Sequence, residues 1–454
     1  MASLNTNKKT AGSTITTHEG GPAQPTSPIN QLRRSVASCF LWEDGFYEDG
    51  ISIGQRISDL AAKCSYQQVV NLAIECRTKH NLRHVPLLLL ASLTRREERT
   101  GAANTTPLWA ALEQVIQRPD EISEFLSIYW TLNSANGKKG PISAQVRRGL
   151  GEAFRKFNAY SLGKYKGNKK NIALRDVIRL VRPTPLNAEQ SNLWKQLVTN
   201  PIPIPNTWET RLSAGEDKRA VFTELLQEGQ LGYLALLRNL RNMEESKVDD
   251  KLVAKALIAR KNGAEKVLPF RFIAAWRATT NGRIHTALEK SLRDTMDTMA
   301  SLKGRTAVLV DVSGSMGALL SRNSDMTRMD AACALAMLCR GDVDVFSFSD
   351  KTVEVPRCGD PFQMVEAIKK SQPNSSTYLG EAVEHLNRLD RYDRYIVITD
   401  EQSADSVPDP KAKNSYMINV ATDKHGVGYR KWVHLDGFSE GVLRWITEYE
   451  TFNA

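Results

Sequence analysis

The chain changes its hydrophobic pattern near residue 304, and this change constrains the fold more than any other feature. Before it, apolar residues recur at spacings of three and four, as in Ile284, Leu288 and Leu292, which is typical of amphipathic helices. After it, continuous apolar and β-branched runs such as Thr306–Val310 alternate with amphipathic segments. Such runs indicate strands buried on both faces, and strand–helix alternation indicates a parallel sheet. The sequence therefore predicts an α-helical part followed by an α/β domain.

The helical part is expected over residues 28–303. A helix that begins at Val221 should run towards Met243, with a break at Gly229 and Gly232. Many helices in succession with short connections favour paired-helix repeats of the HEAT type, stacked into a solenoid. Residues 1–27 are polar, with almost no large apolar side chains, and are expected to form a disordered tail.

The α/β domain is expected over residues 304–454. Besides Thr306–Val310, its expected strands are Val343–Phe348, Tyr395–Ile398, Tyr416–Val420 and Trp432–Leu435. Its expected helices are Met326–Cys339, Pro361–Lys370, Leu379–Leu389 and Glu440–Tyr449. Two prolines in Ser406–Pro410 allow no helix of ordinary length after Asp400.

Oxygen-bearing side chains follow two of these strands. The first strand ends in Asp311-Val312-Ser313-Gly314-Ser315, Thr377 precedes a helix, and Asp400 follows Tyr395–Ile398. Because loops after the strands of a doubly wound sheet meet at one edge, these side chains could converge there. The candidate ligands are Asp311, Ser313, Ser315, Thr377 and Asp400, a hard oxygen set that suits a divalent metal, in particular Mg²⁺. The alternative is a vestigial site that hydrogen-bonds internally and stays empty.

No catalysis is expected at this site, and the chain is not expected to be an enzyme. Hydrolysis would need a general base beside a metal-bound water. Glu401 is the only nearby candidate, and a solvated position at the rim is the favoured interpretation of this residue.

Basic charge is concentrated in the helical part. Of the chain's 61 Lys+Arg and 51 Asp+Glu, residues 304–454 hold 17 and 22, a balance of −5. This leaves 44 and 29, a balance of +15, for residues 1–303. The asymmetry favours a polyanionic partner for the helical part alone, and the alternative is a merely soluble basic surface.

The strongest basic segment is residues 138–182, with 13 Lys+Arg against 2 Asp+Glu. Phosphate backbones attract such a surface because binding releases condensed counterions. The candidates for nucleic-acid contact are Lys138, Lys139, Arg147, Arg148, Lys164, Lys166, Lys169, Lys170, Arg175 and Arg179. Tyr165 could stack on an unpaired base, or could simply be a half-buried tyrosine.

The remaining composition favours a cytoplasmic protein. No apolar run reaches the length of a membrane-spanning helix, and no secretory pattern opens the sequence. The 6 cysteines form no CxxC pair, which is typical of buried thiols in a reducing compartment.

The motifs resemble two known families. At the candidate metal ligands, residues 303–454 resemble a von Willebrand factor A domain with its metal-ion-dependent adhesion site. The whole chain resembles the Ro autoantigen family, which carries the TROVE module, and it looks more like a bacterial or phage member than an animal one. The matching segments are Phe40-Leu41-Trp42, Lys164-Tyr165-Lys166, Leu234–Met243 (LALLRNLRNM, the most specific), Pro269-Phe270, Asp311–Met316 and Asp436-Gly437-Phe438.

The resemblance implies a ring of HEAT-like repeats whose ends are held together by a Rossmann-like metal domain. It also implies that single-stranded 3′ ends of misfolded noncoding RNAs thread a basic central hole, and that a structured Y RNA binds the outer face. Arg238, Asn239 and Arg271 fall where contacts facing the hole would be expected. The resemblance also implies a histidine near Leu174 that contributes to Y RNA binding in animal relatives; this chain has no histidine there, so its contacts with such an RNA are expected to differ.

The main hypothesis is a noncoding-RNA scaffold or quality-control protein without catalysis. It is expected to be a monomer, with RNA and in some cases a ribonuclease as partners, and with neither DNA nor membranes. The alternative is a protein-binding module in which the open metal position takes an acidic residue of a partner and the basic face is incidental. A third hypothesis is a metal-dependent nuclease.

Overall fold

The structure is a computed structural model that describes most of the chain. The described residues are 16–17, 20–23, 27–37, 50–80, 82–134, 139–165, 172–199, 202–203, 205–267, 270–297, 301–320, 325–421, 425–428, 430–437 and 441–452. Within these ranges, no helix combines the length and apolar character that crossing a lipid bilayer requires. Five cysteines lie in the described part, all free, and all but Cys358 are buried.

Helices α1–α10 form the first half of the helical part. They are α1 (Pro28–Ala37), α2 (Gly50–Ala62), α3 (Tyr66–Thr78), α4 (Val85–Ser92), α5 (Leu108–Val115), α6 (Pro119–Asn133), α7 (Ala144–Phe154), α8 (Ala159–Lys164), α9 (Leu174–Val181) and α10 (Ala188–Thr199), with 3₁₀ turns η1 (Glu97–Thr100) and η2 (Ala102–Asn104). Their apolar faces share one hydrophobic core that runs from Leu32 to Ile202. Local signals fix the helix starts: the Ser65 hydroxyl accepts the Gln68 N–H, and the Gln68 side chain accepts the Ser65 N–H.

The second half belongs to another core. Its helices are α11 (Trp208–Ser213), α12 (Lys218–Gln227), α13 (Tyr233–Arg238), α14 (Leu240–Glu245), α15 (Asp250–Ala259), α16 (Phe270–Arg277) and α17 (Gly282–Asp297), with the 3₁₀ turn η3 (Ala264–Lys266). The predicted break between Val221 and Met243 is present, because Gly229 has φ +65° and Gly232 caps α13. The core of this half continues into one face of the sheet.

The α/β domain contains a six-stranded mixed sheet in the order β3-β2-β1-β4-β5-β6. The strands are β1 (Leu302–Asp311), β2 (Gly341–Phe348), β3 (Thr352–Val355), β4 (Arg394–Thr399), β5 (Asn414–Asn419) and β6 (Val433–Asp436). All neighbouring strands pair in parallel except β2 and β3. The helices are α18 (Arg328–Leu338), α19 (Pro361–Lys369), α20 (Leu379–Leu389) and α21 (Gly441–Phe452), with the 3₁₀ turn η4 (Gly314–Gly317).

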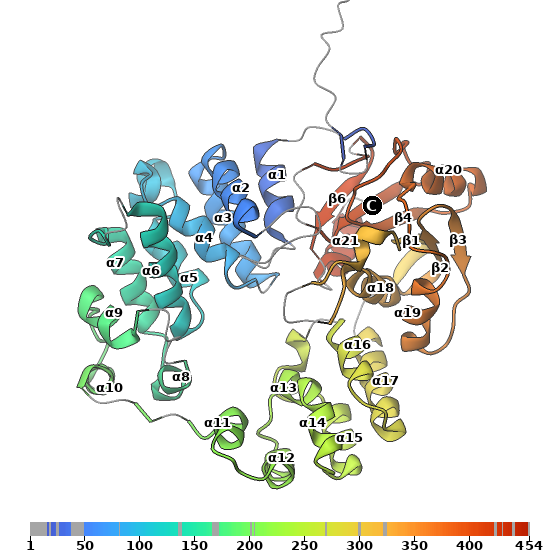
Figure 1. Cartoon of the computed structure of the whole chain (residues 1–454). Helices are drawn as coiled ribbons and strands as arrows, with labels where there is room; N and C mark the ends of the chain where they lie inside the picture. The colour runs from blue at the N-terminus through green and yellow to red at the C-terminus, as the bar shows by residue number, and fades with distance from the viewer. Residues whose placement is uncertain are drawn as a thin grey trace, which may run out of the picture.

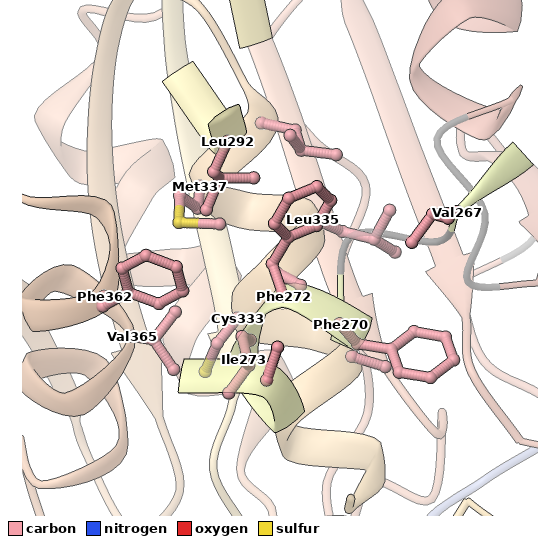
Figure 2. Close-up of a cluster of buried hydrophobic side chains, with 14 of the residues drawn as sticks. Val267, Phe270, Phe272, Ile273, Leu292, Cys333, Leu335, Met337, Phe362 and Val365 are labelled. Carbon is pink, nitrogen blue, oxygen red and sulfur yellow. The ribbon is translucent and has the colours of Figure 1, made fainter. Parts of the chain in front are cut away.

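The helical part and the α/β domain form one continuous arrangement. The helices follow an arc whose two ends both lie against the α/β domain (Figure 1), because α1 contacts β6 while α16 and α17 contact α18 and α19. At the second contact, Phe272 and Ile273 of α16 lie beside Cys333 and Leu335 of α18 (Figure 2). The Trp276 and Phe362 rings stack there with centroids 4.1 Å apart.

The predicted fold class is confirmed: a helical part is followed by a sheet with helices on both faces. The prolines after Asp400 also act as expected, since residues 401–413 contain no helix. Two observations were not anticipated. The short strand β3 was not predicted. Thr17, which belongs to the segment expected to be a disordered tail, is buried and donates its hydroxyl to Ser403 O at 2.7 Å.

Candidate functional site

The five candidate metal ligands come from three loops at the carboxyl ends of the parallel strands. Asp311 ends β1 and is followed by Ser313 and Ser315, while Asp400 follows β4 and Thr377 precedes α20. Backbone hydrogen bonds hold the loops together, from Gly314 N to Ser375 O at 3.1 Å and from Ala404 N to Thr377 O at 2.8 Å. The edge position follows from the sheet topology, because parallel strands bring their carboxyl ends to one side.

These side chains are buried and partly bonded to one another. Their exposed fractions are 0% for Asp311 and Asp400, 1% for Ser313 and Thr377, and 4% for Ser315. The Asp311 carboxylate accepts the Ser313 N–H at 2.9 Å and the Thr399 hydroxyl at 2.6 Å. The hydroxyls of Ser313 and Ser315 lie 3.3 Å apart. Three of the five predicted ligands therefore share one compact loop, hydrogen-bonded to the loop that carries Thr377.

Two carboxylates side by side in the interior repel each other. Burial raises the pKa of Asp311, and the charge of Asp400 raises it further. A cation among these oxygens would relieve the repulsion, and carboxylates with hydroxyls are ligands that Mg²⁺ prefers. The residues present therefore fit such an ion.

Arg328 is a buried cation beside this set that the sequence did not single out. It is the first residue of α18, is 6% exposed, and its Nη1 lies 3.7 Å from Asp400 Oδ2. Its guanidinium compensates part of the charge of the two carboxylates. The chain thus carries one fixed positive charge of its own at the site.

The interpretation of Glu401 as a solvated residue at the rim is wrong, because its side chain is 0% exposed. Its carboxylate accepts Arg34 Nη1 at 2.5 Å and the Val427 N–H at 3.1 Å, and it lies 3.2 Å from His434 Nδ1. Burial alone would raise the pKa of Glu401, but the charges and hydrogen bonds of Arg34 and His434 lower it to about 2. The backbone of Glu401 has φ +59°, which turns the chain away from β4.

This contact joins the first helix of the arc to the sheet. Arg34 belongs to α1, is 1% exposed, and also donates to His425 O at 3.2 Å. Its Nη1 lies 3.9 Å from Asp436 Oδ1, which accepts Asn419 Nδ2 at 3.0 Å. Glu401 is therefore a structural anion adjacent in sequence to the candidate metal ligand Asp400, not a free general base.

The basic segment is only partly described. Lys138, Lys166, Lys169 and Lys170, like the Phe40-Leu41-Trp42 motif, lie outside the described residues. Lys164 is half-buried, and the other described candidates are exposed. Lys139 lies before α7, Arg147 and Arg148 lie on α7, and Arg175 and Arg179 lie on α9.

Aromatic rings orient several of these cations. The Arg148 guanidinium lies 3.7 Å from the centre of the Trp109 ring, and Lys139 Nζ lies 4.8 Å from that of Trp130. Tyr165 is contacted by the Arg118 guanidinium at 4.1 Å, so a cation already covers its ring. Leu174, near which the resemblance implied a histidine, is buried at the start of α9 and faces the core.

The three inner candidates differ in accessibility. Arg238 is exposed at the end of α13, and Arg271 is half-buried on α16. Burial lowers the pKa of Arg271, and the neighbouring charge of Arg238 lowers it further. Asn239 is 3% exposed; its Nδ2 donates to Ala235 O at 2.8 Å and its Oδ1 accepts Asn242 Nδ2 at 3.1 Å. Asn239 therefore orders the junction of α13 and α14.

Comparisons with known proteins bear on this arrangement. Residues 200–313 match the model of the TROVE domain family, which spans α11–α17 and β1. No curated protein sequence matches the chain. Among solved structures, the crystal structure of the Deinococcus radiodurans Ro (RSR) protein matches with a TM-score of 0.59 and 17% sequence identity, covering 94% of this chain and 100% of that one. Likeness at this identity establishes a shared fold.

Proposed function

We propose that this chain, whose residues 200–313 match the TROVE domain model and whose fold is similar to that of a Ro protein, binds noncoding RNA in the cytoplasm as a monomeric ribonucleoprotein scaffold. Single-stranded 3′ ends of misfolded RNA bind the inner side of the arc, and a structured, Y-like RNA binds the outer basic face. A ribonuclease that acts on the captured RNA is the expected protein partner.

The pair of Arg238 and Arg271 carries this proposal. The two guanidinium groups are close enough for one to lower the pKa of the other, yet no described carboxylate lies within 4.0 Å of either. α13, which ends at Arg238, borders the centre of the arc (Figure 1). Two like charges kept close together, one of them half-buried, cost stability unless an anion joins them, and phosphate is an anion that guanidinium groups recognise well.

The outer face supports a second, separate RNA surface. Arg147 and Arg148 of α7 and Arg175 and Arg179 of α9 are exposed, and the two helices pack together. Cations on adjacent helices can follow the phosphates of a folded RNA without reading its bases. Such contacts would bind by charge and shape.

We also propose that Asp311, Ser313, Ser315, Thr377 and Asp400 hold a divalent cation, with Mg²⁺ the best fit. The ion would supply a fixed positive charge and one position open to an outside oxygen ligand. The site is proposed to act without catalysis, because Glu401, the candidate base, is held by Arg34 and His434. Intact labelled RNA after incubation with the protein and Mg²⁺ is the expected result, and cleavage would contradict it.

The two RNA surfaces are tested by fluorescence anisotropy with a single-stranded 3′ tail and a tailless RNA hairpin, each over a series of salt concentrations. The double variant Arg238→Gln, Arg271→Gln should weaken binding of the tail about 100-fold and leave the hairpin nearly unchanged. Arg175→Glu with Arg179→Glu should do the opposite. Arg219→Gln on the exposed face of α12 is the matched control, since it removes an exposed arginine charge elsewhere.

Affinity for both RNAs should fall steeply with salt, because binding releases counterions. If wild-type protein binds neither RNA, or binds with no dependence on salt, the proposal fails. Capture of an acidic peptide only in the presence of Mg²⁺, with indifference to RNA, would instead favour the protein-binding alternative.

A further inference from the structure

A cavity of about 310 Å³ lies between α9, the turn after it, and α10. Its apolar lining includes Ile178, Trp194 and Val198. Trp194 is 6% exposed and packs edge-on against Phe154, with ring centroids 6.4 Å apart at 71°. The walls are therefore fixed by the core of the first half, and the cavity exists before any ligand arrives.

The charged groups of the cavity are all basic. Arg179, Arg182 and Lys195 line it, and none of the described lining residues is acidic. Arg182 and Lys195 are exposed, and no described carboxylate lies within 4.0 Å of either. Arg179 has a carboxylate neighbour, Asp176, at 3.5 Å, but this pair is largely solvated and worth little. The cavity thus combines an apolar interior with a positive rim.

The cavity also adjoins the outer basic face. α9 carries both Arg175 and Arg179 of that face and Ile178 of the cavity. An RNA held by the outer cations would pass its backbone along the rim. The Arg179 side chain connects the two elements, since its Nη2 donates to Val198 O of α10 at 3.4 Å.

We propose that this cavity receives one unpaired nucleobase of a bound RNA, while Arg182 and Lys195 contact the flanking phosphates. This inference rests on the proposed function, because it adds a base-binding site to the outer RNA surface. A base is planar and apolar on its faces, and it stacks on aromatic and aliphatic walls. An apolar protein segment would fill the same interior, but it would supply no anion for Arg182 and Lys195. The phosphates on either side of a base supply those anions.

The site predicts a dependence on bases that the outer cations alone would not give. The probe is a hairpin RNA with a single-stranded loop, compared with the same hairpin whose loop nucleotides are abasic. Wild-type protein should bind the first on the order of tenfold more tightly, the usual effect of one stacked base. Ser191→Trp, which fills the cavity without changing its charge, should abolish this preference. Gln196→Trp, on the exposed side of the same helix, is the matched control and should keep it.

A second variant leaves the cavity open, so that the test does not depend on whether Ser191→Trp folds. Arg182→Ala should weaken both hairpins alike and reduce the salt dependence of binding by about one phosphate contact. If wild-type protein binds the two hairpins equally, or if Ser191→Trp keeps the preference while circular dichroism shows it folded, the base site is wrong. Wild-type protein that binds neither hairpin would overturn the proposed function itself, which distinguishes the two failures.

Discussion

Replacing Glu401 by Gln tests how the first helix of the arc is attached to the α/β domain. The substitution keeps the size of the side chain but removes its charge. Arg34 is 1% exposed and would lose its nearest anion, leaving Asp436 at 3.9 Å. Removing one partner of a buried ion pair costs about 3–5 kcal/mol. Because Asp436 offers partial compensation, we expect the lower end, about 3 kcal/mol.

Native-state hydrogen exchange measures this change locally. The amides of α1 should exchange on the order of 100-fold faster in Glu401→Gln, because their opening free energy falls by about 3 kcal/mol. Glu289→Gln is the control, since Glu289 forms an exposed i,i+4 pair with Arg293 on α17 and such pairs contribute about 0.5 kcal/mol or less. Equal exchange of α1 in the two variants would refute the structural role of the Arg34–Glu401 pair.

Three further predictions concern the same edge of the sheet. The folded-state pKa of Glu401 is about 2 against an ordinary 4.5, so the stability that its charge contributes is present above pH 4.5 and is lost as the pH falls towards 2. The free energy of unfolding in urea should therefore fall by about 2 kcal/mol between pH 6 and pH 3 in wild type, but not in Glu401→Gln. Mg²⁺ at a hundred times its dissociation constant should stabilise the wild type by about 2.7 kcal/mol. Asp311→Asn should lose this stabilisation, yet it should resist urea better than wild type without metal, because one of two buried like charges is gone. If Mg²⁺ still stabilises Asp311→Asn, Asp311 is not a ligand. Arg328→Met should raise Mg²⁺ affinity in calorimetry roughly tenfold by removing a competing charge, and an unchanged affinity would show that Arg328 does not act on the site.

Much of the α/β domain could be predicted from sequence, because its strands are apolar and buried on both faces. The helix at Leu379–Leu389 has the predicted bounds, since its apolar stripe and its flanking residues agree. β3 could not be predicted in this way: Thr352–Val355 is a short edge strand with only its last residue buried. A strand of this kind lacks the continuous apolar run that identifies the others.

The candidate site was predictable only where its residues lie in recognisable local patterns. Asp311, Ser313 and Ser315 form such a pattern, and the topology of the sheet brings the loops of Thr377 and Asp400 to the same edge. Glu401 was misjudged because its partner Arg34 lies 367 residues earlier in the chain. An ionisable residue without a local partner looks solvated in a sequence, and only tertiary structure shows that a distant cation stabilises it. The cavity beside Trp194 could not be predicted from sequence either, because it depends on how α9 packs against α10.

The two contacts between the helical arc and the α/β domain differ in how much apolar surface they bury, and this difference decides which one separates more easily. The contact of α16 with α18 combines apolar side chains such as Phe272 and Leu335 (Figure 2) with an ion pair, in which Arg277 Nη2 lies 2.9 Å from Asp330 Oδ1. Parting this contact would expose both apolar and charged groups to water, and the apolar surface adds a cost of its own. The contact of α1 with β6 depends on a buried ion pair, whose partners water solvates well once they separate. An RNA too folded to thread an arc closed at both ends could reach Arg238 and Arg271 only after one contact parts. Separation at α1 leaves mainly charged groups in water, whereas separation at α16 also exposes apolar side chains, so loss of Glu401 should speed the binding of such an RNA while leaving the contacts of α16 intact.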